Sequence, residues 1–235
     1  MSTGLRKRQY LPPERSQIMK SDLTPVVSEA NAQFLFSPRE AHFARVLQDP
    51  KRRLVVTILF TDIVESTRQV EALGDRKWSN LLERHHAIVR RQLAFFGGCE
   101  IEVPGDGFLA IFDTSTSAIQ CARAIRAALR PIGLKIRAGL HAGECELAAC
   151  RIRGIAVHIA ARIVRTAQAG QILVSSTAKE LASGSGLTFS AGVAHVLKGL
   201  SSSWQLFELS DERSEAKHYQ LSKIPKSISM RQVLN

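Results

Sequence analysis

Two aspartates stand where carboxylates could bind metal ions. Asp62 stands two residues after the end of the apolar run 54–60, and Asp106 lies between two glycines about forty residues later. The run 54–60 predicts a fully buried strand, and short strands are predicted over 100–104 and 108–112, on either side of Asp106. If these strands are neighbours, the two carboxylates lie side by side and repel each other unless a cation neutralises them. Oxygen ligands of this kind favour Mg²⁺ or Mn²⁺.

The residues after Asp62 predict the start of a helix that could bind phosphate. Ser66 and Thr67 are typical helix caps. Backbone N–H groups of Val64, Glu65, Ser66 and Thr67 could therefore surround phosphate oxygens. Each aspartate alone fits a helix cap or a turn equally well. Together they indicate a site for a metal-bound nucleoside triphosphate.

These segments resemble the catalytic domain of the class III adenylate/guanylate cyclases. That family carries a buried strand ending in Phe-Thr-Asp-Ile, as at 60–63, and a later Gly-Asp-Gly, as at 105–107. The resemblance extends over residues 53–209. It implies that Asp62, Ile63 and Asp106 hold two Mg²⁺ or Mn²⁺ ions per site.

Three further positions match motifs of the same family. Arg137 stands in its Arg-x-Gly-x-His-x-Gly pattern, and Arg162 ends its Gly-x-x-Val-Asn-x-Ala-x-Arg helix. The resemblance implies that Arg137 and Lys198 bind the triphosphate. The resemblance also implies a catalytic role for Arg162, because its positive charge would stabilise the negative charge that builds on the α-phosphate. His158, expected to be catalytic too, replaces the usual Asn, so its protonation would add a pH dependence.

Other positions depart from the family pattern. Adenylate cyclases of the family carry Lys and Asp or Thr at the two base-reading positions, which are Glu102 and Arg151 here. The charges of the two positions are thus exchanged relative to the family. The pair still offers one hydrogen-bond donor and one acceptor, which could read the edge of adenine or of guanine. Glu65 stands where a glycine is common, and its carboxylate would be unfavourable beside a triphosphate.

We expect a cyclase that converts a nucleoside triphosphate, ATP ahead of GTP, to the 3′,5′-cyclic nucleotide and pyrophosphate. The resemblance implies a head-to-tail homodimer with composite sites. One protomer would supply Asp62, Asp106 and Arg137, and its partner the remaining residues, which are Glu102, Arg151, His158, Arg162 and Lys198. The alternative is a degenerate homologue that binds nucleotide or dimerises without turnover.

Composition argues against several other classes of protein. The formal net charge of the chain is +11. Residues 1–53 carry 10 basic and 5 acidic side chains, so this segment alone contributes a net charge of +5. No zinc-finger spacing or aromatic-interleaved basic patch predicts binding to nucleic acid.

The longest apolar run is far shorter than the ~20 residues of a membrane span, and the N-terminus does not resemble a signal peptide. Four cysteines without metal-type spacing indicate reduced thiols. We therefore expect a cytoplasmic protein.

The order of predicted elements is β-α-β-β-α-β followed by a further α/β segment. This order favours an α+β fold, a ferredoxin-like antiparallel sheet with helices on one face. We expect a basic extension over 1–52 with a helix near 38–48, a catalytic domain over 53–209 and a disordered polar tail over 210–235. His85 and His86 are expected to be half-buried and exposed helix residues, not ligands.

Overall fold

The computed structural model describes residues 52–103, 105–148 and 151–210. The extension predicted over 1–52, its helix near 38–48 and the tail predicted over 210–235 lie outside these residues, apart from Arg52 and Ser210. No helix of the described part is long and apolar enough to cross a membrane.

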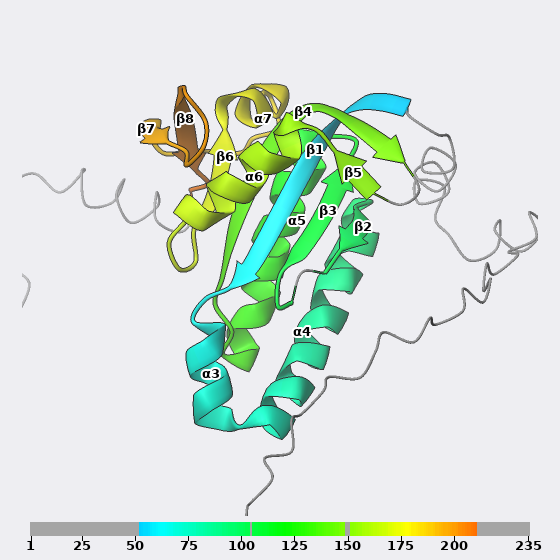
Figure 1. Cartoon of the computed structure of the whole chain (residues 1–235), viewed down its shortest axis with the longest axis vertical. Coiled ribbons are helices and arrows are strands. Elements are labelled where there is room, and N and C mark those ends of the chain that lie inside the picture. The colour runs from blue at the N-terminus through cyan, green and yellow to red at the C-terminus, as the bar shows by residue number, and fades with distance from the viewer. Residues whose placement is uncertain (1–51, 104, 149–150, 211–235) are drawn as a thin grey trace, which may run out of the picture. The chain divides into compact units, whose positions relative to one another are not determined.

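The described strands form one eight-stranded sheet in the order β2-β3-β1-β4-β6-β8-β7, with β5 paired to β4 (Figure 1). The strands are β1 (Arg52–Ile63), β2 (Cys99–Glu102), β3 (Phe108–Phe112), β4 (Ile136–Ala148), β5 (Arg151–Arg153), β6 (Ile172–Ser175), β7 (Val193–Val196) and β8 (Ser203–Glu208). In the part β2-β3-β1-β4, all neighbours are antiparallel, which confirms the predicted ferredoxin-like sheet. β6 extends it parallel to β4.

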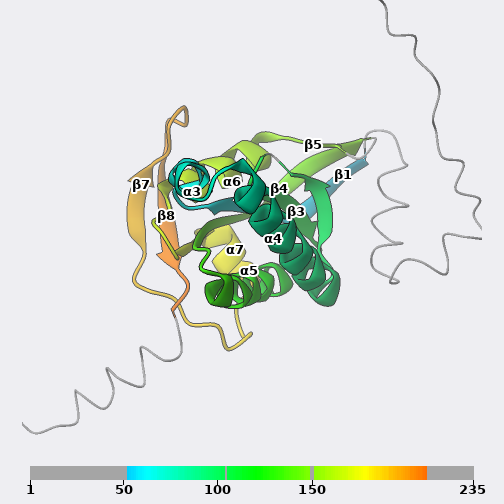
Figure 2. The same cartoon turned by 90° about the horizontal axis from the view of Figure 1, so that it is seen from below.

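Helices cover both faces of this sheet (Figure 2). They are α3 (Ser66–Leu73), α4 (Asp75–Phe96), α5 (Ser115–Leu129), the short 3₁₀ helix η1 (Arg130–Ile132), α6 (Ile155–Thr166) and α7 (Ser176–Leu181). α4 and α5, the helices of the ferredoxin-like part, share one face as predicted. α6, from the added α/β segment, packs on the opposite face, so the one-face arrangement does not hold for the whole domain.

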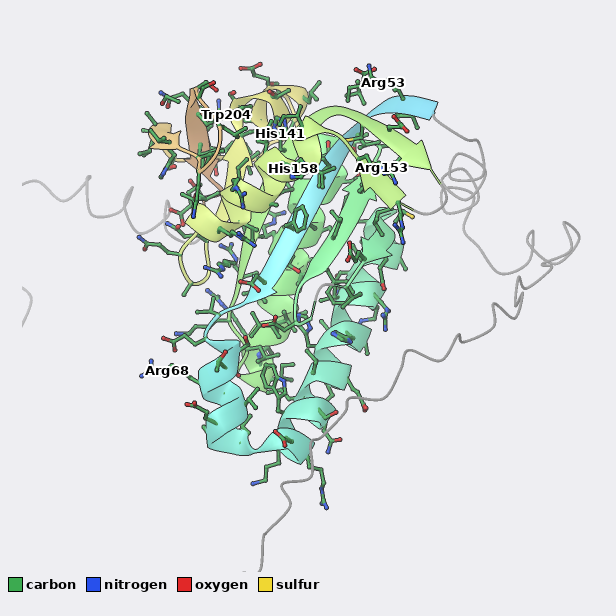
Figure 3. All side chains as sticks on the ribbon, viewed as in Figure 1. Arg53, Arg68, His141, Arg153, His158 and Trp204 are labelled. Atoms are coloured by element: carbon green, nitrogen blue, oxygen red, sulfur yellow. The ribbon has the colours of Figure 1, made fainter. Side chains whose placement is uncertain are left out.

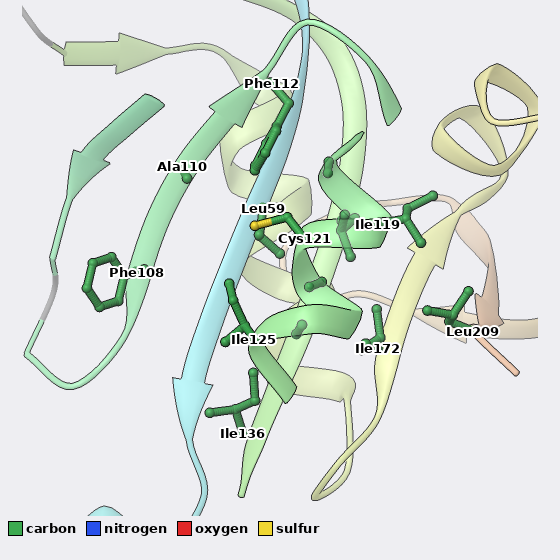
Figure 4. Close-up of a cluster of buried hydrophobic side chains, with 14 of the residues drawn as sticks. Leu59, Phe108, Ala110, Phe112, Ile119, Cys121, Ile125, Ile136, Ile172 and Leu209 are labelled. Atoms are coloured by element: carbon green, nitrogen blue, oxygen red, sulfur yellow. The ribbon is translucent and has the colours of Figure 1, made fainter. Parts of the chain in front are cut away.

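Side-chain alternation along β1 decides which residues face the site. Leu59 and Ile63 belong to the core beneath α4 and α5, which Figure 4 shows in part. Val56 and Ile58 belong to the smaller core beneath α6. Because side chains alternate along a strand, Asp62 lies on the α6 face.

Two glycines of β4 let α6 approach the sheet closely. A Cβ at Gly139 would lie 2.3 Å from the backbone nitrogen of Val164, and one at Gly143 would lie 2.8 Å from Cβ of Ala156. Neither position has room for a side chain. The α6 backbone therefore rests directly on β4 at Gly139.

The turn between β1 and α3 contains a strained backbone conformation. Glu65 is the N-cap of α3 with φ 56° and ψ 35°, the left-handed region, and its side chain makes no capping hydrogen bond. Within the described ranges it is the one non-glycine residue with positive φ. This conformation explains why glycine suits the position, since a Cβ costs about 1–2 kcal/mol there.

Burial of His85 is deeper than the sequence indicated. The prediction of a half-buried side chain was wrong, because His85 is fully buried on the inner face of α4, 5.6 Å from the Phe108 ring centre. His86 is partly buried rather than exposed. Neither ring nitrogen of His85 has a hydrogen-bond partner. Burial, assisted by the charge of His86, lowers the pKa of His85 to about 4.

Acid should destabilise the protein through His85. The unfolded chain takes up a proton near pH 6.5, whereas folded His85 does so only near 4, so stability falls as pH drops between these values. The loss attributable to this residue is up to about 1.4 kcal/mol per pH unit. Urea unfolding of wild type and His85→Leu at pH 7, 6 and 5 measures it. An equal dependence on pH in both proteins would contradict the prediction.

Replacing the strained Glu65 should stabilise the fold. Glu65→Gly removes the Cβ from a left-handed residue, so the free energy of unfolding should rise by about 1 kcal/mol. Glu65→Ala is the matched control, because it removes the same carboxylate and keeps the Cβ. The lost ion pair to Arg68 is exposed on both sides and contributes little. Equal stability of the Gly and Ala variants in denaturant titrations would show that backbone strain is not the cause.

Candidate active site

The end of β1 brings Asp62 next to Arg137. These residues are direct partners in the antiparallel ladder between β1 and β4. Nε of Arg137 donates a hydrogen bond of 2.8 Å to Oδ2 of Asp62, and Nη2 donates to the same oxygen. About a third of each side chain is exposed. The predicted metal ligand and the predicted phosphate ligand therefore form an ion pair.

Asp106 lies at the same end of the sheet, in the turn before β3. Phe108 is paired with Thr61 of β1, so the antiparallel direction brings residue 106 towards Ile63. Oδ2 of Asp106 is buried and has no hydrogen-bond partner. A buried carboxylate oxygen without a donor is costly, and a divalent cation would satisfy it. Asp62 and Asp106 thus fit Mg²⁺ or Mn²⁺, which prefer such oxygen ligands.

Ile63 remains a predicted metal ligand through its backbone alone. Its side chain is buried in the core beneath α4 and α5 and carries no donor atom. Only the carbonyl oxygen could therefore reach an ion.

The turn after Asp62 presents backbone amides at the start of α3. The first N–H groups of a helix have no partner within it, which leaves those of Ser66 and Thr67 for an anion. The amide of Val64 already donates to the carbonyl of Lys135 at 2.9 Å. Glu65 directs its carboxylate to Arg68 at 3.0 Å. The Glu65 carboxylate is thereby paired with a cation on the exposed side of the turn.

A cavity of about 710 Å³ brings together three of the other predicted residues. Glu102 of β2, Arg151 of β5 and His158 of α6 line it. Its remaining walls are largely apolar, formed by Phe60, Ile101, Leu109, Ile152, Val157 and Ala161. A flat aromatic base suits such walls, with the charged groups available for its polar edge.

Arg153 also lines this cavity and was missed by sequence reasoning. Figure 3 labels Arg153 on β5 and His158 on α6. Arg151 and Arg153 are exposed while Ile152 between them packs towards the core beneath α6. That alternation of charged, apolar and charged residues is the sequence signal that indicates β5.

Arg162 and Lys198 form a second group of cations. Nε of Arg162 donates to the backbone carbonyl of Lys198 at 3.0 Å. His158 lies one turn before Arg162 on α6, which places both on one helix face. The structure thus places Arg162 and His158 along α6, with Arg162 in contact with the backbone of Lys198 in the loop after β7.

Among the described residues, the cavity lining contains members of only one half of the predicted site. Of the described residues that line the 710 Å³ cavity, none is Asp62, Asp106 or Arg137. Phe60 connects the halves, since it lines the cavity and stands two residues before Asp62 on β1.

Two thiols of the described part, Cys121 and Cys145, are buried and are not joined in a disulfide. Burial raises the pKa of Cys121 to about 12. Burial and the nearby Glu144 carboxylate raise the pKa of Cys145 to about 11. These two thiols are therefore unsuited to nucleophilic chemistry, and Cys150 lies outside the described residues.

Known proteins resemble this chain in sequence and in structure. The chain is 32% identical to an adenylate cyclase of Lachancea kluyveri and 31% identical to one of Podospora anserina, over 52% of its length in each case. It spans only 8% and 7% of those proteins. It is also 30% identical to an uncharacterized protein of Mycobacterium bovis, over 55% of this chain and 45% of that one.

Solved cyclase structures share the fold. The adenylyl cyclase CyaB from P. aeruginosa superposes with a TM-score of 0.63 at 24% identity, covering 70% of this chain and 98% of that chain. The guanylyl cyclase Cya2 gives 0.60 at 22%, covering 68% and 94%. A model of the adenylate and guanylate cyclase catalytic domain matches residues 49–222. The chain therefore belongs to the family of adenylate and guanylate cyclase catalytic domains.

Proposed function

We propose that this protein is an active nucleotide cyclase that forms a 3′,5′-cyclic nucleotide and pyrophosphate from a nucleoside triphosphate. The observation that carries the proposal is the register of β1 with its neighbours, which brings Asp62 and Asp106 to the same end of adjacent strands. The buried, unpartnered Oδ2 of Asp106 supports a metal ion there. A nucleotide-binding module without turnover is the alternative.

Asp62, Asp106 and the carbonyl of Ile63 would hold the Mg²⁺ or Mn²⁺ ions. When bound, such ions lower the pKa of the ribose 3′-hydroxyl and neutralise the phosphates. The protein's own part would be to keep the two carboxylates near each other, and the pairing of β1 with β3 and β4 at this end of the sheet supports that role.

The cationic side chains would bind and orient the phosphates. Arg137 can donate two parallel hydrogen bonds to a pair of phosphate oxygens, and here two of its N–H groups donate to the single oxygen Oδ2 of Asp62. Lys198 would bind the β- and γ-phosphates, and Arg162 would stabilise the charge that builds on the α-phosphate. His158 would donate a hydrogen bond to the ribose.

Glu102 and Arg151 would read the base in the 710 Å³ cavity. We propose ATP as the substrate because the fungal relatives are named adenylate cyclases. GTP is the second candidate, favoured by the carboxylate of Glu102. A carboxylate can accept from both N1–H and the 2-amino group of guanine, while Arg151 donates to O6.

We propose that the site is completed by a second copy of the chain in a head-to-tail dimer. One protomer would supply Asp62, Asp106 and Arg137. The partner would supply the cavity residues together with Arg162 and Lys198. The described cavity lining, which contains no member of the first group, supports this arrangement.

The purified protein with Mn²⁺ should form cyclic product from ATP or GTP, read by mass. Asp106→Ala should abolish turnover while the fold persists, because it removes a metal ligand from a turn.

Mixing Asp106→Ala with Arg162→Ala should restore up to roughly a quarter of wild-type activity if subunits of a symmetric dimer exchange randomly. Nucleotide binding without product from the wild type would favour the alternative. A mixture that stays inactive despite confirmed exchange would exclude composite sites.

A mutant cycle tests whether Glu102 and Arg151 act as a pair. Glu102→Lys alone should lose about 2–5 kcal/mol of transition-state stabilisation, because two cations then meet in the cavity. Adding Arg151→Asp should recover much of the ATP activity. Glu102→Lys with Arg153→Asp is the matched control, with the same charge change two residues away on β5, and should not recover. Additive effects in the Glu102/Arg151 cycle would mean that the two side chains do not interact.

A further inference from the structure

The Asp62–Arg137 ion pair occupies a metal ligand of the proposed site. Two N–H groups of one guanidinium donate to a single oxygen, Oδ2 of Asp62. Asp106 is different, since its Oδ2 has no partner. Of the two carboxylates that would hold metal, one is thus neutralised by a cation of the chain itself, and this inference rests on the proposed function.

The backbone fixes this pairing. Asp62 and Arg137 are direct partners in the β1–β4 ladder, and both lie on the α6 face of the sheet. Each side chain is partly exposed, 30% for Asp62 and 34% for Arg137. The guanidinium therefore has room to rotate away from the carboxylate into solvent or towards a ligand.

A free divalent ion would meet a poor ligand set while the pair is intact. Any cation that approaches Asp62 comes close to the guanidinium of Arg137, and like charges at such distances repel each other. Both hydrogen bonds lie on Oδ2, so the pair weakens metal binding rather than blocking it.

A metal–triphosphate complex offers both side chains a replacement partner. Its anionic oxygens can take the two N–H groups of Arg137, and its cation can take the released carboxylate of Asp62. Two ion pairs exchange partners, and no charge is left unpaired. We infer that Arg137 is a placeholder for the metal beside Asp62, so that Asp62 accepts metal when a triphosphate draws Arg137 away.

The inference predicts opposite effects of one substitution on two ligands. Arg137→Met removes the charge and keeps most of the side-chain length. It should bind Mn²⁺ alone more tightly than wild type, on the order of fivefold, which is the upper range for a partly exposed ion pair. It should bind Mn²⁺ with inorganic tripolyphosphate more weakly. A residue with only a structural role would weaken both. Electron paramagnetic resonance of free Mn²⁺ and calorimetry give the two affinities.

Arg53→Met is the matched control for net charge. Arg53 pairs with Glu144 at 3.5 Å and lies at the opposite end of β1 (Figure 3), about 30 Å from Asp62 along an extended strand. It should leave both affinities unchanged. Equal or weaker binding of Mn²⁺ by Arg137→Met, relative to wild type, overturns the placeholder role. If the wild type nevertheless forms cyclic product with Mn²⁺, the proposed function stands and only this inference fails.

Discussion

The antiparallel pairing of β1 with β4 is the interaction on which both halves of the site depend. It runs along the whole of β1, from Arg52 opposite Leu147 to Ile63 opposite Ile136. At one end it puts the Asp62 carboxylate beside the Arg137 guanidinium. β4 also carries α6 on its glycines, so the same strand positions the helix that bears His158 and Arg162.

Local sequence was sufficient to predict much of the fold. The strand over 108–112 was predicted with the observed bounds, because it is a short apolar run between polar residues. β1 extends beyond the predicted 54–60 at both ends. Hydrogen bonding to a neighbouring strand on both sides of β1 keeps its polar end residues in the sheet. In β4, Gly143 would normally indicate a turn, but here it makes room for α6.

The residue types of the site were readable from sequence, but their contacts were not. The motifs give Asp62 and Arg137, whereas their pairing depends on the register between strands 75 residues apart. Arg153 was missed because a three-residue strand gives little periodicity. The left-handed conformation of Glu65 was hidden for a related reason, since a glutamate gives no signal of positive φ and only the glycine usual in the family indicates it.

The contact between Gly139 and Val164 has a mechanical consequence. With no side chain between the backbones, β4 and α6 can hardly slide past each other, so they move as one body. Arg137 lies two residues from this contact on β4, and Arg162 lies two residues from it on α6. In a head-to-tail pair of the kind proposed, these arginines serve different active sites. A rigid β4–α6 unit would therefore couple the positions of the two arginines, so that a shift of one at its site would move the other at the second site.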